Sequence, residues 1–471
     1  MNNQPSFFDR LNNWARNSVT LKLFTIGVLI LFLLIPASML TSLINEREHI
    51  RDTAIQEVSS KWGLNQTISG PVIAVPYESI YQTDDGKAAV KNGFVHFLPD
   101  ELRIEGTLIP EKRYRGIYVV VLYNAKLSVS GKFGRLEPTT IKVPEADIQW
   151  SKALLNIGVS DMKGVQNQLQ LTLNGDRVLD FGPGVVASDL FASGANIPLD
   201  LSNRDELAEM RFSFDLNLNG SSDLYFVPFA KENNIQLTSN WSNPSFEGDF
   251  LPDNREVNEQ GFSATWKVLQ LNRNYPQQGQ DNFIGENNAN SNTYYDDRAG
   301  YVNYSETAFR SNTGAFGVKL LLPIDEYQKS MRSAKYATFF VIITFLTFFF
   351  IEVLNRRRLH PIQYILIGSA IILFYVLLLS ISEHLSFDWA YWIACLIIVL
   401  LITIYSSFVL KNRRLTFMVS GLLLILYGFF YSILQLQDYA LLLGSFGLLL
   451  ILGTIMYLTR NVDWYHLRQD D

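Results

Sequence analysis

Residues His360–Tyr391 read HPIQYILIGSAIILFYVLLLSISEHLSFDWAY, and this stretch decides the fold of the 471-residue chain. Between Pro361 and Ser382 it has no charged side chain and supplies the roughly 20 apolar-dominated residues that a bilayer-spanning helix needs. The basic run NRRRLH leads into it, whereas the segment from Ser382 to Asp388 has no lysine or arginine. Because short loops rich in lysine and arginine stay in the cytoplasm, the stretch predicts a transmembrane helix that runs outward from the cytoplasm.

Further apolar runs on either side of this stretch predict more transmembrane helices. The predicted spans are 21–44, 335–354, 361–382, 389–410, 415–434 and 439–458. The first, Leu21–Ile44, is apolar apart from Lys22 and follows Arg10 and Arg16, a pattern that also fits a signal peptide. Signal-peptide cores usually end after about 7–15 residues, whereas this run continues past Pro36. An uncleaved membrane anchor is therefore the favoured interpretation.

Basic residues in the loops orient all six spans. Lys411, Arg413 and Arg414 lie in a loop that the alternation of spans places on the same side as the NRRRLH run, and the loops at 383–388 and 435–438 have no lysine or arginine. Basic loops stay inside, so segments 1–20 and 459–471 are predicted to be cytoplasmic and segment 45–334 to lie outside. In a bacterium with two membranes, this topology predicts a multi-pass inner-membrane protein with a periplasmic domain.

The outer segment, 45–334, begins as a helix and changes its hydrophobic period near Leu64. Ile50, Ala54, Val58 and Trp62 recur at steps of four, which predicts a helical stalk that continues the first span. Short β-branched and aromatic runs then alternate with turn residues, a pattern typical of strands with one buried face. The predicted fold class is an α-helical polytopic membrane protein with a large β-rich periplasmic domain, antiparallel and sandwich-like, after the first transmembrane helix. A bundle of five transmembrane helices, 335–458, follows it.

One part of the outer segment, Asn272–Gly300, is rich in asparagine, glutamine, aspartate and glycine and has almost no aliphatic residues. Such a segment buries too little apolar surface to offset the entropy lost on ordering. It is predicted to be a mobile loop, either without function or acting as a lip that binds a partner.

Several classes of function find no support in the sequence. The net charge is −6 and there is no basic domain or long tract of lysine and arginine, which argues against nucleic-acid binding. Nucleophile-elbow, phosphate-loop and zinc-helix motifs are absent. Cys395 is the only cysteine, and the five histidines have no metal-ligand spacing. The chain is therefore predicted to be no enzyme and to need no cofactor or metal.

Polar residues near the predicted membrane boundaries are the candidates for function. Glu383 and His384 lie at the outer end of a span, where they could relay protons or bind a ligand, or could simply be solvated by water. Glu352 is expected to pair with Arg356 at the i,i+4 spacing. Aspartate, glutamate, lysine and arginine are absent deep in the spans, which makes an ion-coupled carrier the minority interpretation.

A set of motifs in one order along the chain closely resembles the CreD family of bacterial inner-membrane proteins. The motifs are Leu43-Ile44 before Glu46-Arg47, Trp62-Gly63, Gln66-Thr67, Gly70-Pro71, Asn240-Trp241, Pro244-Ser245-Phe246, Gly261-Phe262 with Trp266, and His360-Pro361-Ile362-Gln363-Tyr364 through Ser382-Glu383-His384. The resemblance covers essentially the full chain. It implies a role in cell-envelope integrity, with effects on colicin tolerance and the β-lactam response under a two-component system, and it implies no catalytic residues.

Two functional hypotheses follow from the sequence. The first is a structural or binding role of the periplasmic domain, with the lipid bilayer and envelope or cell-wall components, or another membrane protein, as partners. The alternative is a transporter or small-molecule sensor that uses polar groups of the bundle. The candidate functional residues are Glu46, Arg47, His360, Gln363, Tyr364, Glu383 and His384. A periplasmic hydrolase is a third, weaker interpretation.

Overall fold

A computed structural model of the protein describes residues 19–82, 88–138, 141–203, 209–286, 313–322, 326–354, 359–436 and 439–460. The chain divides into two units. The helical unit combines residues 1–50 with 324–471, and the β unit is residues 51–323. Helix α2, Val19–Trp62, contributes residues to both. It is one helix of 44 residues, so the first apolar run and the predicted stalk are continuous.

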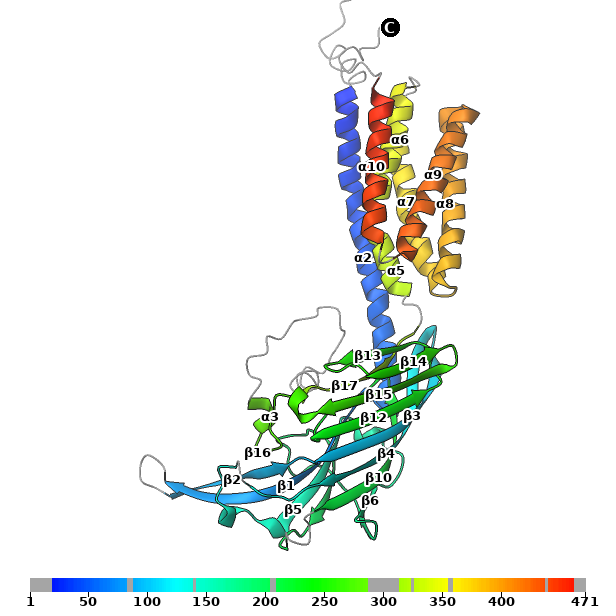
Figure 1. The fold of residues 1–471 in the computed structure, drawn as a ribbon. Coiled ribbons are helices and arrows are strands. Elements are labelled where there is room, and N and C mark those ends of the chain that lie inside the picture. The colour runs from blue at the N-terminus through cyan, green and yellow to red at the C-terminus, as the bar shows by residue number, and fades with distance from the viewer. Residues whose placement is uncertain are drawn as a thin grey trace, which may run out of the picture. The chain divides into compact units, whose positions relative to one another are not determined.

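The helical unit contains α2 and the helices of the C-terminal bundle (Figure 1). These are α5 Glu326–Lys335, α6 Ala337–Leu354, α7 Pro361–Ser382, α8 Phe387–Leu410, α9 Arg413–Gln435 and α10 Ala440–Thr459. Within the described residues, five helices are long and apolar enough to cross a membrane, and α10 holds a shorter apolar stretch, Leu441–Tyr457. The long apolar helices confirm the predicted polytopic class, whereas the short α5 was not predicted.

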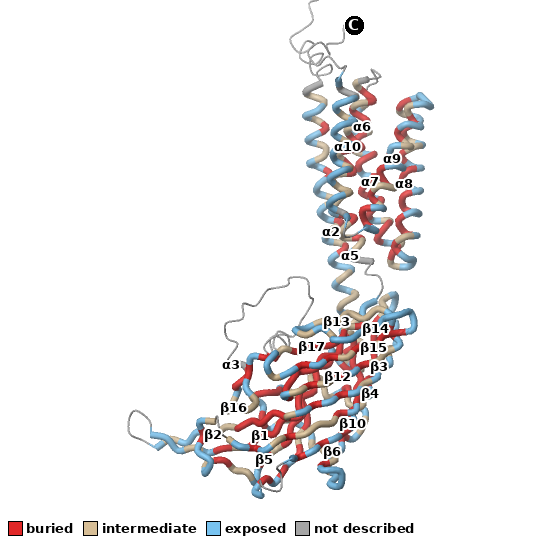
Figure 2. Tube along the Cα trace, viewed as in Figure 1, coloured by how far each residue is buried: buried red, intermediate tan, exposed pale blue. Residues whose placement is uncertain are grey.

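Aromatic side chains fill the interior of the bundle where α7, α8 and α9 meet. Phe374 of α7 contacts the rings of Tyr391 and Tyr427, with centroid distances of 5.4 and 4.7 Å. The Tyr391 hydroxyl donates a hydrogen bond to the Tyr427 carbonyl oxygen at 2.7 Å. Buried rings of this size contribute packing area and fix the relative rotation of their helices. Figure 2 shows buried residues along α7, the helix formed by the uncharged stretch Pro361–Ser382.

The β unit consists of two sheets (Figure 1). The nine-stranded sheet has the order β13-β17-β11-β1-β5-β9-β8, with β2 pairing both β1 and β16. Its strands are β1 Gln66–Gln82, β2 Ala88–Phe97, β5 Ala153–Val159, β8 Gly182–Pro183, β9 Gly194–Leu199, β11 Asp223–Phe226, β13 Pro244–Gly248, β16 Gln278–Gln280 and β17 Phe316–Leu320. The eight-stranded sheet has the order β14-β15-β12-β3-β4-β10-β6-β7. Its strands are β3 Glu101–Arg115, β4 Tyr118–Phe133, β6 Gln170–Leu173, β7 Arg177–Asp180, β10 Met210–Ser221, β12 Glu232–Ser239, β14 Asn254–Asn258 and β15 Gly261–Leu269.

Alternation along the strands builds one core between the two sheets. In β3, Leu102, Ile104 and Leu108 are buried, whereas Arg103, Glu105 and Thr107 are exposed. The same hydrophobic core contains Ile73 of β1 in the other sheet and Trp266 of β15. Because successive side chains of a strand point to opposite faces, this pattern gives each sheet one buried face, and the buried residues in Figure 2 follow the strands accordingly. The β-rich, two-layer prediction is confirmed.

The sheets are mixed rather than purely antiparallel, which corrects one detail of the predicted class. β1 pairs in parallel with β11, matching Gln66 with Leu224, and β12 pairs in parallel with β3, matching Glu232 with Glu101. Alternation of apolar and polar residues reports which face of a strand is buried but not the direction of its neighbour. The sequence therefore did not predict which neighbouring strands are parallel.

The prediction of a mobile loop at Asn272–Gly300 is wrong for its first half; residues 287–300 lie outside the described part of the chain. Strand β16 pairs with β2, and the short helix α3, Phe283–Glu286, follows it. Three side chains pack in a second hydrophobic cluster against the nine-stranded sheet: Tyr275, Phe283 and Ile284. The Tyr275 hydroxyl donates hydrogen bonds to the carbonyl oxygens of Pro228 and Thr313, and burial raises its pKa to about 12. A few aromatic anchors thus order a segment whose composition is mostly polar.

Candidate functional site

The residues singled out from the sequence lie at the two ends of α7. His360, Gln363 and Tyr364 stand at its first turn, and Glu383 and His384 follow its last residue. A helix of 22 residues is about 33 Å long. These residues therefore form two separate clusters and not one site.

At the first end, His360 and Gln363 cap the helix. His360 Nδ1 accepts a hydrogen bond from the Ile362 backbone N–H at 3.3 Å, and Gln363 Oε1 accepts one from the His360 N–H at 2.9 Å. The first turn of any helix has backbone N–H groups without intrahelical acceptors, and this reciprocal arrangement satisfies two such donors. The HPIQ motif is thus explained by helix initiation.

Tyr364, by contrast, belongs to a buried ionic cluster that joins three helices. Its hydroxyl donates a hydrogen bond to Glu352 Oε2 of α6 at 3.1 Å, and Lys22 Nζ of α2 lies 3.0 Å from Glu352 Oε1. The Glu352 side chain is only 4% exposed, whereas that of Lys22 is 32% exposed. Arg356, the partner expected from the sequence, lies outside the described residues. Glu352 is held by a residue from the other end of the chain, which local spacing could not reveal.

Helix α2 packs along the bundle through a regular seam. Ile26, Leu33 and Leu40 recur every seven residues and are buried, a spacing typical of helices packed side by side. Leu33 fits against Gly368 of α7, where an added Cβ would lie 2.2 Å from Leu33 Cδ1. The absence of a side chain at Gly368 therefore permits the close approach of the two helices.

At the other end of α7, the same face of α2 contacts Glu383. Arg47 comes seven residues after Leu40, and its Nε lies 3.8 Å from Glu383 Oε1. The Arg47 side chain is 44% exposed and that of Glu383 is 13% exposed. Solvent therefore screens the pair in part, and at 3.8 Å it contributes about 1 kcal/mol. Glu46 and His384 are exposed at the surface of the helical unit. The structure thus joins Arg47 to Glu383, and does not bring His384 into a buried site.

The β unit contains a buried histidine, His96 of β2. His96 Nε2 lies 2.6 Å from Asp189 Oδ2, and the His96 ring stacks with Phe283 at a centroid distance of 6.0 Å. His96 Nδ1 is buried and has no hydrogen-bond partner among the described residues. Within the same residues, no three histidine, cysteine, aspartate or glutamate side chains are grouped as a metal site would require.

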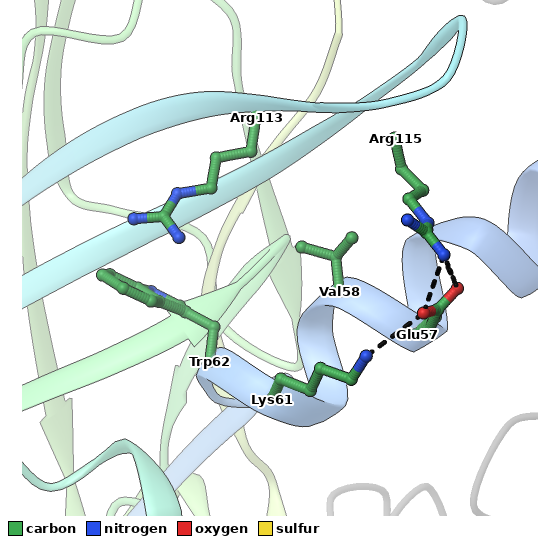
Figure 3. Close-up of a pocket in the computed structure, with 6 residues that line it drawn as sticks. All are labelled: Glu57, Val58, Lys61, Trp62, Arg113 and Arg115. Atoms are coloured by element: carbon green, nitrogen blue, oxygen red, sulfur yellow. Dashed lines mark hydrogen bonds and ion pairs between the residues drawn. The ribbon is translucent and has the colours of Figure 1, made fainter.

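A pocket of about 210 Å³ lies between the last turns of α2 and the β3–β4 hairpin, within the β unit (Figure 3). Its lining residues are Glu57, Val58, Lys61, Trp62, Arg113 and Arg115. Three of these side chains are cationic, one is anionic and one is a tryptophan. Concave sites that combine apolar surface with a few placed charges are typical of ligand binding.

Two interactions position the cationic groups of the pocket. The Arg113 guanidinium stacks over the Trp62 ring at 4.2 Å, and the Trp62 Nε1–H donates a hydrogen bond to the Tyr123 carbonyl oxygen at 3.3 Å. Arg115 Nη2 donates to Glu57 Oε1 and Oε2 at 3.0 and 3.1 Å. Lys61 Nζ donates to Glu57 Oε1 at 3.1 Å, as the dashed lines in Figure 3 show.

The sequence analysis identified residues on only one wall of this pocket. The predicted stalk stripe included Val58 and Trp62, which line it. The run Lys112-Arg113-Tyr114-Arg115 alternates basic and aromatic residues, and could have marked the opposite wall. Nothing in the sequence, however, indicated that this hairpin returns to the end of α2.

Comparisons with known proteins place the chain among inner-membrane proteins. A family model described as "Inner membrane protein CreD" matches residues 18–465. The chain is also similar to the "Inner membrane protein CreD" of Escherichia coli (strain K12). The two are 34% identical over 439 residues, which cover 93% of this chain and 91% of that protein.

Proposed function

The chain belongs to the CreD family of inner membrane proteins, and from this premise we propose that it supports the integrity of the cell envelope by a non-enzymatic binding role of its β unit. The observation that carries the proposal is the cationic and aromatic pocket between α2 and the β3–β4 hairpin. Such a site can hold an envelope component without changing it chemically. Colicin tolerance and the β-lactam response, which the family resemblance implies, are the expected phenotypes.

The proposed topology places the β unit in the periplasm and both termini in the cytoplasm. Lys411, Arg413 and Arg414 stand between α8 and α9, whereas Glu383–Ser386, between α7 and α8, has no lysine or arginine. Basic loops are retained on the cytoplasmic side. On this topology the pocket faces the compartment that holds the cell wall.

The arrangement around His96 supports a role other than hydrolysis. His96 is the only histidine in residues 51–323. In a serine-hydrolase triad, one ring nitrogen bonds the orienting carboxylate and the other bonds the nucleophile. Here Nε2 faces Asp189, but Nδ1 has no partner among the described residues. Tight packing under Phe283 is better suited to stability than to substrate access.

Rescue of a deletion strain tests the proposal. Residues 1–334, which keep α2 and the β unit, are expected to restore most of the resistance to detergent and β-lactam that the full chain restores. The physical reason is that the pocket and its supporting strands are complete in this part of the chain. Both proteins are compared at matched abundance in the membrane. Rescue by the full chain alone would move the function to the bundle and overturn the proposal.

One observation favours the alternative of a transporter or sensor. The buried Glu352, bound by Lys22 and Tyr364, is the kind of ionisable group that often serves transport when it lies inside a membrane bundle. The alternative also uses Glu383 and His384. It predicts that Glu383→Gln and His384→Asn abolish rescue at unchanged protein levels. Full rescue by both variants would remove Glu383 and His384 from the mechanism.

A further inference from the structure

We propose that the pocket between α2 and the β3–β4 hairpin binds the phosphate group of an anionic phospholipid, with Arg113 and Arg115 as its main ligands. This inference rests on the proposed binding role of the β unit and names the class of partner. It starts from the charge of the lining, in which Lys61, Arg113 and Arg115 face a single acidic side chain, Glu57.

The geometry of the pocket suits an oxyanion. Glu57 already places a carboxylate between Arg115 and Lys61, with three N–O distances from 3.0 to 3.1 Å. Guanidinium groups bind carboxylate and phosphate oxygens through the same pairs of parallel N–H donors. The Glu57 side chain is 42% exposed, and those of its partners Lys61 and Arg115 are 73% and 58% exposed. Exposed ion pairs are weak, so a phosphate can displace the Glu57 carboxylate.

Arg113 provides a second cation that Glu57 does not neutralise. Its Nε and Nη2 donate to Glu111 Oε1 and Oε2 at 3.0 and 3.4 Å, while its guanidinium is stacked on Trp62. This ion pair is also exposed, so a phosphate can displace the Glu111 carboxylate as well. Stacking on an aromatic ring holds the guanidinium in place without using its N–H donors. Arg113 and Arg115 are two residues apart on β3 and therefore share a strand face. Both arginines line the pocket, Arg113 beside Trp62 and Arg115 beside Glu57 (Figure 3).

Apolar side chains at the tip of the same hairpin favour a lipid as the source of the phosphate. Strands β3 and β4 are joined by the two-residue turn Gly116-Ile117. Tyr114 is 69% exposed and Ile117 is 42% exposed. Aromatic and aliphatic residues next to arginines are typical of surfaces that enter the headgroup region of a bilayer.

The chain also keeps this pocket close to the membrane. Glu57 follows Ile44, the end of the predicted first span, by 13 residues. Because α2 continues through these residues as a helix, the segment spans about 20 Å. The headgroup layer is therefore the anionic surface nearest to the pocket along the chain.

Site-specific crosslinking tests the proposal on the full chain. Ile117 is replaced by the photo-crosslinking amino acid benzoylphenylalanine, and the protein is placed in nanodiscs of phosphatidylcholine with or without phosphatidylglycerol. Lipid adducts on the hairpin peptide are counted by mass spectrometry after illumination. Phosphatidylglycerol is expected to raise the adduct yield. R113Q/R115Q is expected to lower it about 25-fold, since each basic residue near an anionic surface adds about a factor of five.

Two further variants separate binding from an effect on folding. E57Q removes the competing carboxylate, so it is expected to raise the phosphatidylglycerol adduct above that of the parent protein, a gain that a damaged fold would not produce. R135Q is the matched control, because Arg135 is an exposed arginine beside an acidic partner, Glu137, at 3.2 Å. Its adduct yield is expected to equal that of the parent.

Inorganic phosphate distinguishes a lipid from a free anion. At equal ionic strength, phosphate is expected to lower the adduct yield more than chloride does, since it competes for the same two arginines. Equal yields with and without phosphatidylglycerol would overturn the assignment to lipid, and so would an unchanged yield in R113Q/R115Q. If R113Q/R115Q nevertheless lost envelope rescue, the proposed binding role of the β unit would be retained and only the phospholipid would be excluded as its partner.

Discussion

Replacing Trp266 with alanine is expected to lower the free energy of unfolding of the β unit by about 3–5 kcal/mol. Trp266 of β15 is fully buried, and its ring lies 5.7 Å from that of Phe246 and 5.8 Å from that of Phe316. Truncation leaves a large cavity that strands on both sheets cannot close without losing their pairing. Pulse proteolysis of the full chain in detergent, across a urea series and read from cleavage within 51–323, measures the loss.

Two variants identify the cause of that loss. Trp266→Phe keeps most of the ring volume and removes Nε1–H, which is buried and has no acceptor among the described residues. Removing an unpaired donor offsets part of the lost packing, so this variant is expected to cost about 1 kcal/mol or less. Leu271→Ala, at a side chain that is 96% exposed, is expected to change nothing. Equal losses for the phenylalanine and alanine variants would contradict the cavity explanation.

Lys22→Met is expected to destabilise the helical unit by about 3 kcal/mol, the lower end of the cost of breaking a buried ion pair. Methionine keeps the length of the side chain but leaves the Glu352 carboxylate, among the residues that the structure describes, with only the Tyr364 hydroxyl for a partner. The lower end applies because Lys22 is one-third exposed, while Glu352 is almost fully buried. Unfolding of the full chain in detergent, titrated with SDS and followed by circular dichroism, measures the loss.

The double variant Lys22→Met/Glu352→Gln is expected to regain most of this stability, because no unpaired charge remains and the glutamine still accepts the Tyr364 hydrogen bond. Arg47→Gln is the matched control at the other end of α2. Its pair with Glu383 is long, at 3.8 Å, and the Arg47 side chain is 44% exposed, so loss of the pair is expected to cost about 1 kcal/mol. Equal small effects of Lys22→Met and Arg47→Gln would show that the Glu352 cluster is not a buried charge pair.

Trp266 and Glu352 illustrate how far the sequence could predict the surroundings of a buried side chain. Trp266 lay in a strand whose alternation indicated a buried side chain, so its place in the core was predictable from a local pattern. Glu352 lay near the end of an apolar run, where the nearest visible partner was Arg356. The actual partner, Lys22, lies in another helix near the other end of the chain, and its presence in the first apolar run was the only available signal.

The same difference between local patterns and distant contacts explains which other predictions were correct. The length and apolar character of each long helix, and the charges between the helices, are local properties of the chain, so helix positions followed from the sequence. The same holds for the buried face of each strand. The helix cap formed by His360 and Gln363 is local too, but the sequence prediction named these residues as functional candidates and not as a cap. The polar composition of residues 272–286 misled the prediction because ordering depends on a few anchors, among them Tyr275 and Phe283, more than on average composition.

By itself, the amino-acid sequence determined that this protein has a long N-terminal apolar helix, a β-rich middle and an apolar helical bundle, because hydrophobic period and run length act within a few residues. Only the tertiary structure decided that β1 and β12 each have a parallel neighbour, that Lys22 meets Glu352, and that Glu57 meets Arg115 across 58 positions of the chain. Such pairings depend on how distant segments return to one another. Their energy comes from contacts that no local window of sequence contains.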